Sequence, residues 1–185
     1  MPSPADLSWD VPFRVPAEFV LERGHPTSAE LAHGHQQGWL SARDTIRIVD
    51  DKARRGCVLT SNEKEMVLLW PGEDDDQLPG LVEGMAVSGE TRESRQRYWS
   101  YISLGWLWRN RESVEDPFLV LENIFSFLDY PDEMRGFVRF LPVSDGDEPG
   151  EEAMKVRWSR YLSALDAVYR DRDLCSEAVG RDPSL

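Results

Sequence analysis

The residues of this 185-residue chain that could bind a metal ion are its three histidines, His25, His33 and His35. His33 and His35 are two positions apart, a spacing that puts them on different faces of a helix. No cysteine lies near them, and the sequence has no H-E-x-x-H pattern of the kind that holds catalytic zinc. We therefore interpret the histidines as exposed or capping residues and predict no metal site.

Two acidic clusters could instead suggest calcium binding. They are Asp74-Asp75-Asp76 and Asp145-Gly146-Asp147-Glu148. Neither cluster follows the twelve-residue spacing of an EF-hand with its closing glutamate. We therefore expect both clusters to lie in solvated loops.

Acid–base or nucleophilic catalysis has little support in the residue pattern. Asp129 and Glu133 could pair, but both fall at the start of a predicted helix, where capping and the helix dipole explain them. Cys57 and Cys175 lack a neighbouring histidine signature and form no disulfide framework, so we expect reduced thiols. The sequence also has no glycine-rich phosphate loop. We predict no catalytic residue, no cofactor and no enzyme activity.

Charge is a stronger functional signal than any catalytic motif. The net charge is −13, of which Glu73 to Asp76 contributes −4, while Arg111 to Glu152 has twelve carboxylates against three arginines, a net −9. Nucleic-acid binding requires a basic footprint and is not expected. The charge fits a basic protein partner, and the simple alternative is that it keeps the protein soluble. The candidate partner-binding residues are Glu73, Asp74, Asp75, Asp76, Asp145, Asp147 and Glu148.

The elements that must position these residues are helices. Hydrophobic periodicity predicts an all-α fold, a single helical domain of about seven or eight helices over 16–174. An irregular arm at 1–15 and a frayed tail at 175–185 are expected to flank it. No apolar run is long enough to span a bilayer, and the first residues are not a secretory signal, so we expect a cytoplasmic protein with no membrane association.

Capping signals locate most of the helices. A cap at Thr27 or Ser28 begins a helix that ends near Gln37, and the next helix lies between Ser41 and Gly56. Further helices are expected from the Thr60 capping box to Pro71-Gly72, over Leu78 to Val87, from the Asp116-Pro117 cap, and around Trp158 to Tyr169.

The central helix is predicted over roughly 92–110, because its second half is apolar nearly all round. Its Trp99, Trp106 and Trp108 are interpreted as core residues rather than as a ligand surface.

The most distinctive stretch is 129–142. Pro131 suits a first helical turn, and the spacing of the apolar residues predicts a helix that ends at or before Leu141. The apolar face of that helix comprises Met134, Phe137, Val138 and Leu141.

These motifs resemble those of a family of uncharacterised bacterial proteins of similar length. The shared motifs are G-W-L-S at 38–41 and D-Y-P-x-x-M-x-x-F-V-R-x-x-P at 129–142, and the resemblance covers roughly 30–170. The signature residues are Trp39, Trp106, Asp129, Tyr130, Pro131, Met134, Phe137, Arg139 and Pro142. The resemblance implies a small helical bacterial protein and brings no activity with it.

Proteins of this sort occur among the immunity proteins of polymorphic toxin systems. Taken with the charge, the resemblance leads us to expect a non-enzymatic, protein-binding protein, an acidic immunity protein that neutralises a basic toxin. The alternative is a cytosolic helical protein with a structural or regulatory role and a cleft for a small molecule or peptide.

Overall fold

The computed structural model describes residues 13–69, 74–85, 89–142, 146, 148–170 and 172. Within these residues the fold is all-α, without a strand, which confirms the predicted class. The helices are α1 (Ala17–Arg23), α2 (Ser28–Gln36), α3 (Ala42–Arg54), α4 (Ser61–Val67), α5 (Asp74–Met85), α6 (Arg92–Asn110), α7 (Pro117–Phe127) and α8 (Glu151–Tyr169), with short 3-10 helices η2 (Arg111–Ser113) and η3 (Asp132–Phe137). None of these helices is long and apolar enough to cross a bilayer.

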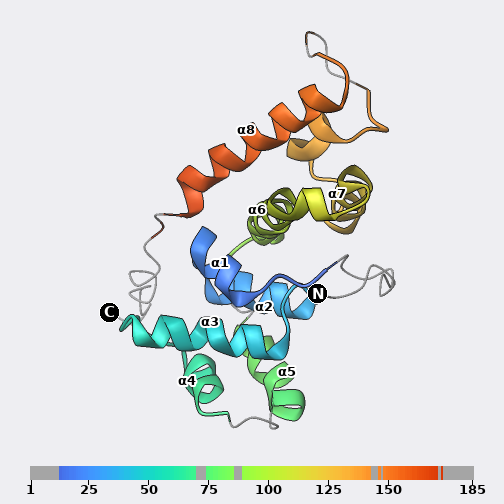
Figure 1. The fold of residues 1–185 in the computed structure, drawn as a ribbon. Coiled ribbons are helices and arrows are strands. Elements are labelled where there is room, and N and C mark those ends of the chain that lie inside the picture. Colours follow the sequence, from blue (N-terminus) through green and yellow to red (C-terminus); the bar gives the residue numbers. More distant parts are fainter. Residues whose placement is uncertain are drawn as a thin grey trace.

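Helix α6 is the centre of the fold, as the sequence predicts. Its residues 98–105 are all buried. Helices α1, α2, α7 and α8 pack against it, while α3, α4 and α5 form the far end of the molecule (Figure 1). A helix that is apolar on all sides needs such neighbours, because no side of it can face water without exposing apolar surface.

Helices α2 and α6 approach each other closely in the core. A Cβ atom placed on Gly34 would lie 1.8 Å from Cζ2 of Trp99, so only glycine fits there. Trp39 stacks on Trp99 with ring centroids 6.2 Å apart, and both rings are fully buried. Trp106 and Trp108 are partly buried and pack against the core. The core assignment of the central tryptophans is therefore confirmed, with Trp99 more deeply placed than Trp106.

The predicted helix starts are confirmed wherever a capping residue was recognised. At each of these positions the side chain accepts a hydrogen bond from a backbone N–H two or three residues later, which satisfies a donor that the helix itself leaves unpaired. The capping residues are Thr27, Ser41, Thr60 and Asp116.

Two boundaries around the acidic segment differ from the prediction. Helix α4 ends at Val67 rather than reaching Pro71. Helix α5 begins at Asp74 instead of Leu78, so Asp74–Asp76 form its first turn rather than a loop. Carboxylates at a helix N-terminus interact favourably with the helix dipole, which explains why an acidic segment becomes helical.

The signature stretch also forms a shorter element than predicted. Only Asp132–Phe137 are helical, in a 3-10 conformation, and Val138 is extended at φ −104° and ψ 122°. The predicted burial of Met134, Phe137 and Val138 is confirmed. In a 3-10 helix residues three apart lie above one another, so the spacing from Met134 to Phe137 fits this helix as well as an α-helix.

Candidate functional site

The predicted partner-binding acids are only partly described. Glu73, Asp145 and Asp147 lie outside the described residues, and so do the side chains of Asp74–Asp76. Glu148 is exposed and precedes α8, which lies at the end of the molecule opposite α5 (Figure 1). The fold therefore does not bring the start of α5 and Glu148 together on one surface.

Basic side chains neutralise much of the acidic stretch 111–152. Arg139 donates from Nε to Glu122 Oε1 and from Nη2 to Asp116 Oδ2, both at 3.0 Å. Other ion pairs of up to 3.9 Å join Arg92 to Asp129, Arg97 to Glu133, Arg135 to Asp132 and Lys155 to Glu152. This stretch is therefore less negative as a folded surface than its own sequence suggests, because α6 and α8 supply cations to it.

A second acidic surface is the α4–α5 end, which comprises residues 61–69 and 74–85. The two helices pack together, and Asn62 Nδ2 donates to the carbonyl oxygen of Leu81 at 2.9 Å. A Cβ atom placed on Gly84 would lie only 1.9 Å from the same Asn62 Nδ2 atom. This close contact fixes α4 against α5.

The α4–α5 end keeps its negative charge. Between Arg55 and Arg92 the sequence has eight carboxylates and one basic residue, Lys64. Glu65 and Glu83 are both exposed, and no ion pair reaches either of them from the described residues. Each lies in the last turn of its helix, where the dipole attracts a cation rather than a carboxylate.

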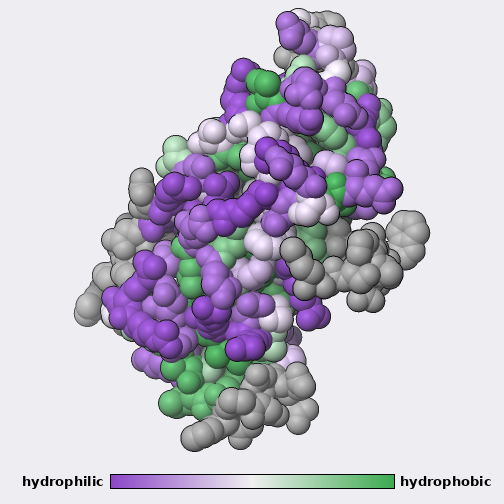
Figure 2. Space-filling view, viewed as in Figure 1, coloured by the Kyte–Doolittle hydropathy of each residue, from purple (hydrophilic) through white to green (hydrophobic). Residues whose placement is uncertain are grey.

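Apolar side chains are exposed beside these carboxylates. Leu68, directly after α4, is 75% exposed, and Val58, just before α4, is 57% exposed. Figure 2 shows hydrophobic residues gathered at this end of the molecule, over α4. Exposed apolar surface next to uncompensated charge is typical of a surface that binds another molecule.

The signature residues Asp129 and Tyr130 have a structural explanation. The N–H of Asp129 donates to Ser126 O at 3.1 Å and that of Tyr130 to Phe125 O at 2.9 Å, which is the Schellman pattern at the end of α7. The Tyr130 ring also contacts the Phe125 ring edge-on, with centroids 5.3 Å apart. Both Asp129 and Tyr130 have positive φ, 65° and 60°, as a chain reversal after a helix requires.

The other signature residues differ in how deeply they are buried. Trp39, Met134 and Phe137 are in the core, Trp106 and Pro131 are partly buried, and Arg139 and Pro142 are exposed. Arg139 acts as the ion-pair centre described above. The signature therefore describes how α7 ends and how η3 packs, and no described contact assigns it a reaction.

Two capping boxes contain buried glutamates with basic partners. In the α4 box, Glu63 accepts from the N–H of Thr60 through Oε2 at 2.7 Å. Its Oε1 accepts from Lys52 Nζ of α3 and from Ser28 Oγ of α2, both at 2.7 Å. Lys52 Nζ also lies 3.3 Å from Ser28 Oγ. The buried carboxylate therefore joins the ends of three helices.

The α2 box repeats this arrangement. Glu30 Oε2 accepts from the N–H of Thr27 at 2.8 Å and is buried. Arg172 donates from Nη1 to Glu30 Oε1 at 3.0 Å and from Nη2 to the carbonyl oxygen of His25 at 2.7 Å. A residue near the end of the chain thus compensates a carboxylate 142 positions earlier.

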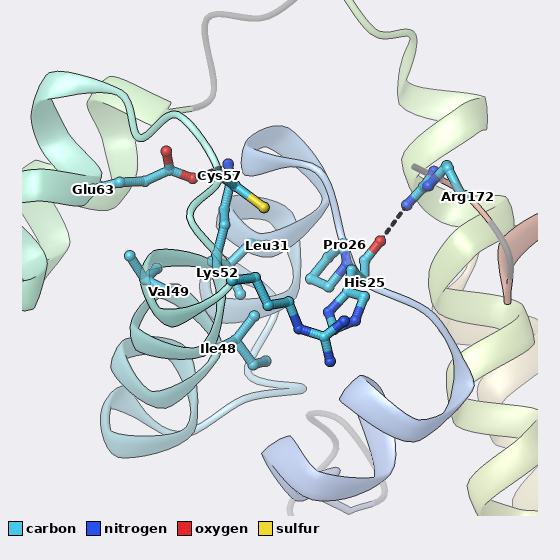
Figure 3. Close-up of a pocket in the computed structure, with 10 residues that line it drawn as sticks. His25, Pro26, Leu31, Ile48, Val49, Lys52, Cys57, Glu63 and Arg172 are labelled. Atoms are coloured by element: carbon cyan, nitrogen blue, oxygen red, sulfur yellow. Dashed lines mark hydrogen bonds and ion pairs between the residues drawn. The ribbon is translucent and has the colours of Figure 1, made fainter. Parts of the chain in front are cut away.

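A pocket of about 100 Å³ is lined by Glu63 and by Arg172, the partner of Glu30 (Figure 3). Its residues come from the loop after α1, from α2, α3 and α4, and from the C-terminal part of the chain. They are His25, Pro26, Leu31, Ile48, Val49, Lys52, Arg55, Cys57, Glu63 and Arg172. Drug-sized ligands need roughly 300–1,000 Å³, so this pocket is too small for such a molecule.

The two buried carboxylates titrate differently. Burial raises the pKa of Glu30, and the hydrogen bonds from Arg172 only partly oppose this effect. Burial acts in the same direction on Glu63, but the hydrogen bonds from Lys52, Ser28 and the Thr60 N–H outweigh it and lower the pKa. Burial and the charge of Arg55 also lower the pKa of His25, so its ring is neutral near pH 7.

Cys57, in the wall of this pocket, is disulfide-bonded. The expectation of reduced thiols was therefore wrong for this residue, and the chain's other cysteine, Cys175, lies outside the described residues. Disulfides persist mainly in oxidising compartments, so this bond does not support a cytoplasmic location, which stays a prediction.

The histidines are partly buried rather than exposed. His35 Nδ1 lies 3.0 Å from Thr45 Oγ1, and burial lowers the pKa of His33 to about 4. Within the described part of the chain no three histidine, cysteine or acidic side chains come together as metal ligands.

Sequence reasoning missed the pocket. One signal was available, because Thr27 to Glu30 has the same capping-box spacing as Thr60 to Glu63. No spacing indicates that Lys52 and Arg172 are the partners of the two glutamates, because those contacts depend on how the helices pack.

Comparison with known proteins identifies a family but no function. Residues 17–165 match a family model described as an uncharacterised protein conserved in bacteria (DUF2247). No curated protein and no solved structure matches the chain. Since the match covers most of its length, the chain belongs to this family of bacterial proteins.

Proposed function

We propose that this protein is a non-enzymatic, protein-binding protein whose α4–α5 end binds a basic partner, most concretely a toxin that it neutralises as an immunity protein. The observation that carries the proposal is the uncompensated charge of that end. Glu65 and Glu83 have no cationic partner among the described residues, whereas the stretch 111–152 is largely paired.

The exposed leucine gives the proposal its second support. A partner that covers Leu68 would remove an apolar side chain from water and bring its basic residues beside Glu65 and Glu83. Charge would then set the association rate and exclude acidic competitors, while the apolar contact would hold the complex.

Charge reversal at the two glutamates tests the proposal. The variant Glu65→Lys/Glu83→Lys places lysines in the last turns of α4 and α5, where the helix dipole favours cations, so the fold should tolerate it. The matched control is Glu115→Lys/Glu148→Lys, which changes the net charge equally at two exposed positions outside the α4–α5 end.

Immobilised wild-type protein is used to capture partners from a bacterial lysate at low and high salt, and mass spectrometry identifies them. A basic protein that the wild type and the control retain, that salt releases, and that the α4–α5 variant loses would support the proposal. Equal retention by both variants would show that the α4–α5 end is not the binding surface. A cellular test follows, in which co-expression must relieve the growth defect that the captured protein causes.

A further inference from the structure

The pocket that Glu63 and Arg172 line has both charged and apolar lining residues. Lys52 of α3 and Arg55, the residue directly after α3, supply positive charge, and the neutral ring of His25 also lines the pocket. The apolar lining residues are Pro26, Leu31, Ile48 and Val49. Three of the lining residues are cations, Lys52, Arg55 and Arg172, against one carboxylate, Glu63. In a chain with a net charge of −13, this excess of cations is a local exception that favours an anion.

Hydrogen-bond donors remain available in this pocket after the described contacts are counted. The Lys52 ammonium group has three N–H donors, and the described residues accept two of them, at Glu63 and Ser28. Arg55 donates from Nε to Asp51 Oδ2 at 2.6 Å, while its two terminal NH₂ groups meet no acceptor among the described residues. Each of these donors can form a charge-assisted hydrogen bond with a carboxylate oxygen.

Size and charge limit the ligand. About 100 Å³ holds only a few non-hydrogen atoms. Glu63 and Asp51 already balance Lys52 and Arg55, so a doubly charged anion would be repelled, whereas a single negative charge can use the remaining donors. The apolar wall would contact a short hydrocarbon tail.

We infer that this pocket binds a short aliphatic carboxylate, with its carboxylate group on Arg55 and Lys52 and its tail on Leu31, Ile48 and Val49. This site is separate from the α4–α5 end and does not depend on the proposed function. Its ligand would stabilise the contact between α2 and α3, because it would join Leu31 of α2 to the α3 side chains and Arg55.

Butyrate titrated into ¹⁵N-labelled protein tests the inference, with chloride exchanged for butyrate so that ionic strength stays constant. We expect saturable shifts of the backbone amides of α3 and of the loop after α1. Arg55→Gln should weaken binding by about tenfold or more, because it removes the charge-assisted donors. The matched control is Arg54→Gln, which removes the same charge from the preceding residue. The Arg54 side chain is 75% exposed and pairs with Asp50, so this variant should bind butyrate as the wild type does.

Inorganic phosphate is the second probe. Saturable phosphate binding without butyrate binding would overturn the carboxylate assignment. Shifts that do not saturate, or an equal loss in Arg54→Gln and Arg55→Gln, would show that the pocket binds no specific anion. Spectra of both variants without ligand show whether each is folded, so that a loss of binding can be assigned to the missing guanidinium group.

Discussion

At the scale of single residues, the buried carboxylates and the positive-φ residues are the positions most sensitive to change. Glu63 is fully buried, and its negative charge is tolerated because Lys52 and two hydrogen bonds compensate it. Removing one member of such a group leaves a charge in a poorly solvated place, whereas removing both charges together does not.

Lys52→Met should therefore destabilise the protein by about 3–5 kcal/mol, since it leaves Glu63 buried without its cation. The double variant Lys52→Met/Glu63→Gln should recover most of that loss, because the amide oxygen can still accept from the Thr60 N–H. Urea denaturation of wild type, both single variants and the double variant gives the coupling energy. Additive effects in this cycle would contradict the network described for Glu63.

Asp129 is sensitive to change because of its backbone conformation rather than its burial. Its φ of 65° is a conformation that glycine adopts more easily, so Asp129→Gly should stabilise the protein by about 0.5–1 kcal/mol. The ion pair lost with Arg92 is 3.5 Å long and exposed, and should contribute little. Asp132→Gly, in η3 where φ is not positive, should not stabilise. Urea midpoints compare the two, and a less stable Asp129→Gly would mean that the carboxylate itself holds the turn.

At the scale of elements, the sequence predicted the helix starts that have a capping side chain, and it also predicted the ends of α2 near Gln37 and of α3 before Gly56. It did not predict the end of α4 at Val67. Thr27, Ser41, Thr60 and Asp116 were recognisable because a capping side chain acts on backbone groups two or three residues away. The start of α5 was missed because acidic residues indicate a loop as readily as a first helical turn. Pocket formation depends on contacts such as Arg172 with Glu30, which no local pattern encodes.

The packing of α2 on α6 gives the clearest element-scale prediction. Gly34→Ala should destabilise the protein by more than about 2 kcal/mol, because the new methyl group would overlap the Trp99 ring and force the helices apart. Gly80→Ala is the matched control. Gly80 lies inside α5, and a Cβ atom placed on it would have no neighbour within 4 Å, so alanine should raise stability by up to about 1 kcal/mol. Thermal denaturation compares both variants, and a neutral Gly34→Ala would contradict the close approach of α2 and α6.

At the scale of the whole molecule, the charge distribution and the response to pH follow from the packing. The net charge of −13 is uneven, since three cations from α6 and α8 pair with carboxylates of 111–152, whereas the described residues of the α4–α5 end contain no arginine. The sequence alone indicated that 111–152, with a net charge of −9, is the more negative surface. It does not show the cations that the fold brings to this stretch.

Stability should fall as the pH drops from about 6.5 to about 4. Burial lowers the pKa of His33 to about 4, so over this range the unfolded chain takes up a proton that the folded protein does not. Glu30 acts in the opposite direction, since its raised pKa lets the folded state take up a proton first. Urea denaturation between pH 7 and 5 should therefore show a smaller loss for His33→Gln than for the wild type. Parallel pH profiles would mean that His33 is protonated in the folded state.

The central claim is that the α4–α5 end attracts a basic partner. Its most direct test is the association rate of the captured partner, measured over a series of sodium chloride concentrations. For the wild type and Glu115→Lys/Glu148→Lys the rate should fall steeply as salt rises, because the Debye length shortens to about 10 Å at 0.1 M. For Glu65→Lys/Glu83→Lys it should be at least about tenfold slower at low salt and should depend much less on salt. Equal rates and equal salt dependence for all three proteins would contradict the claim.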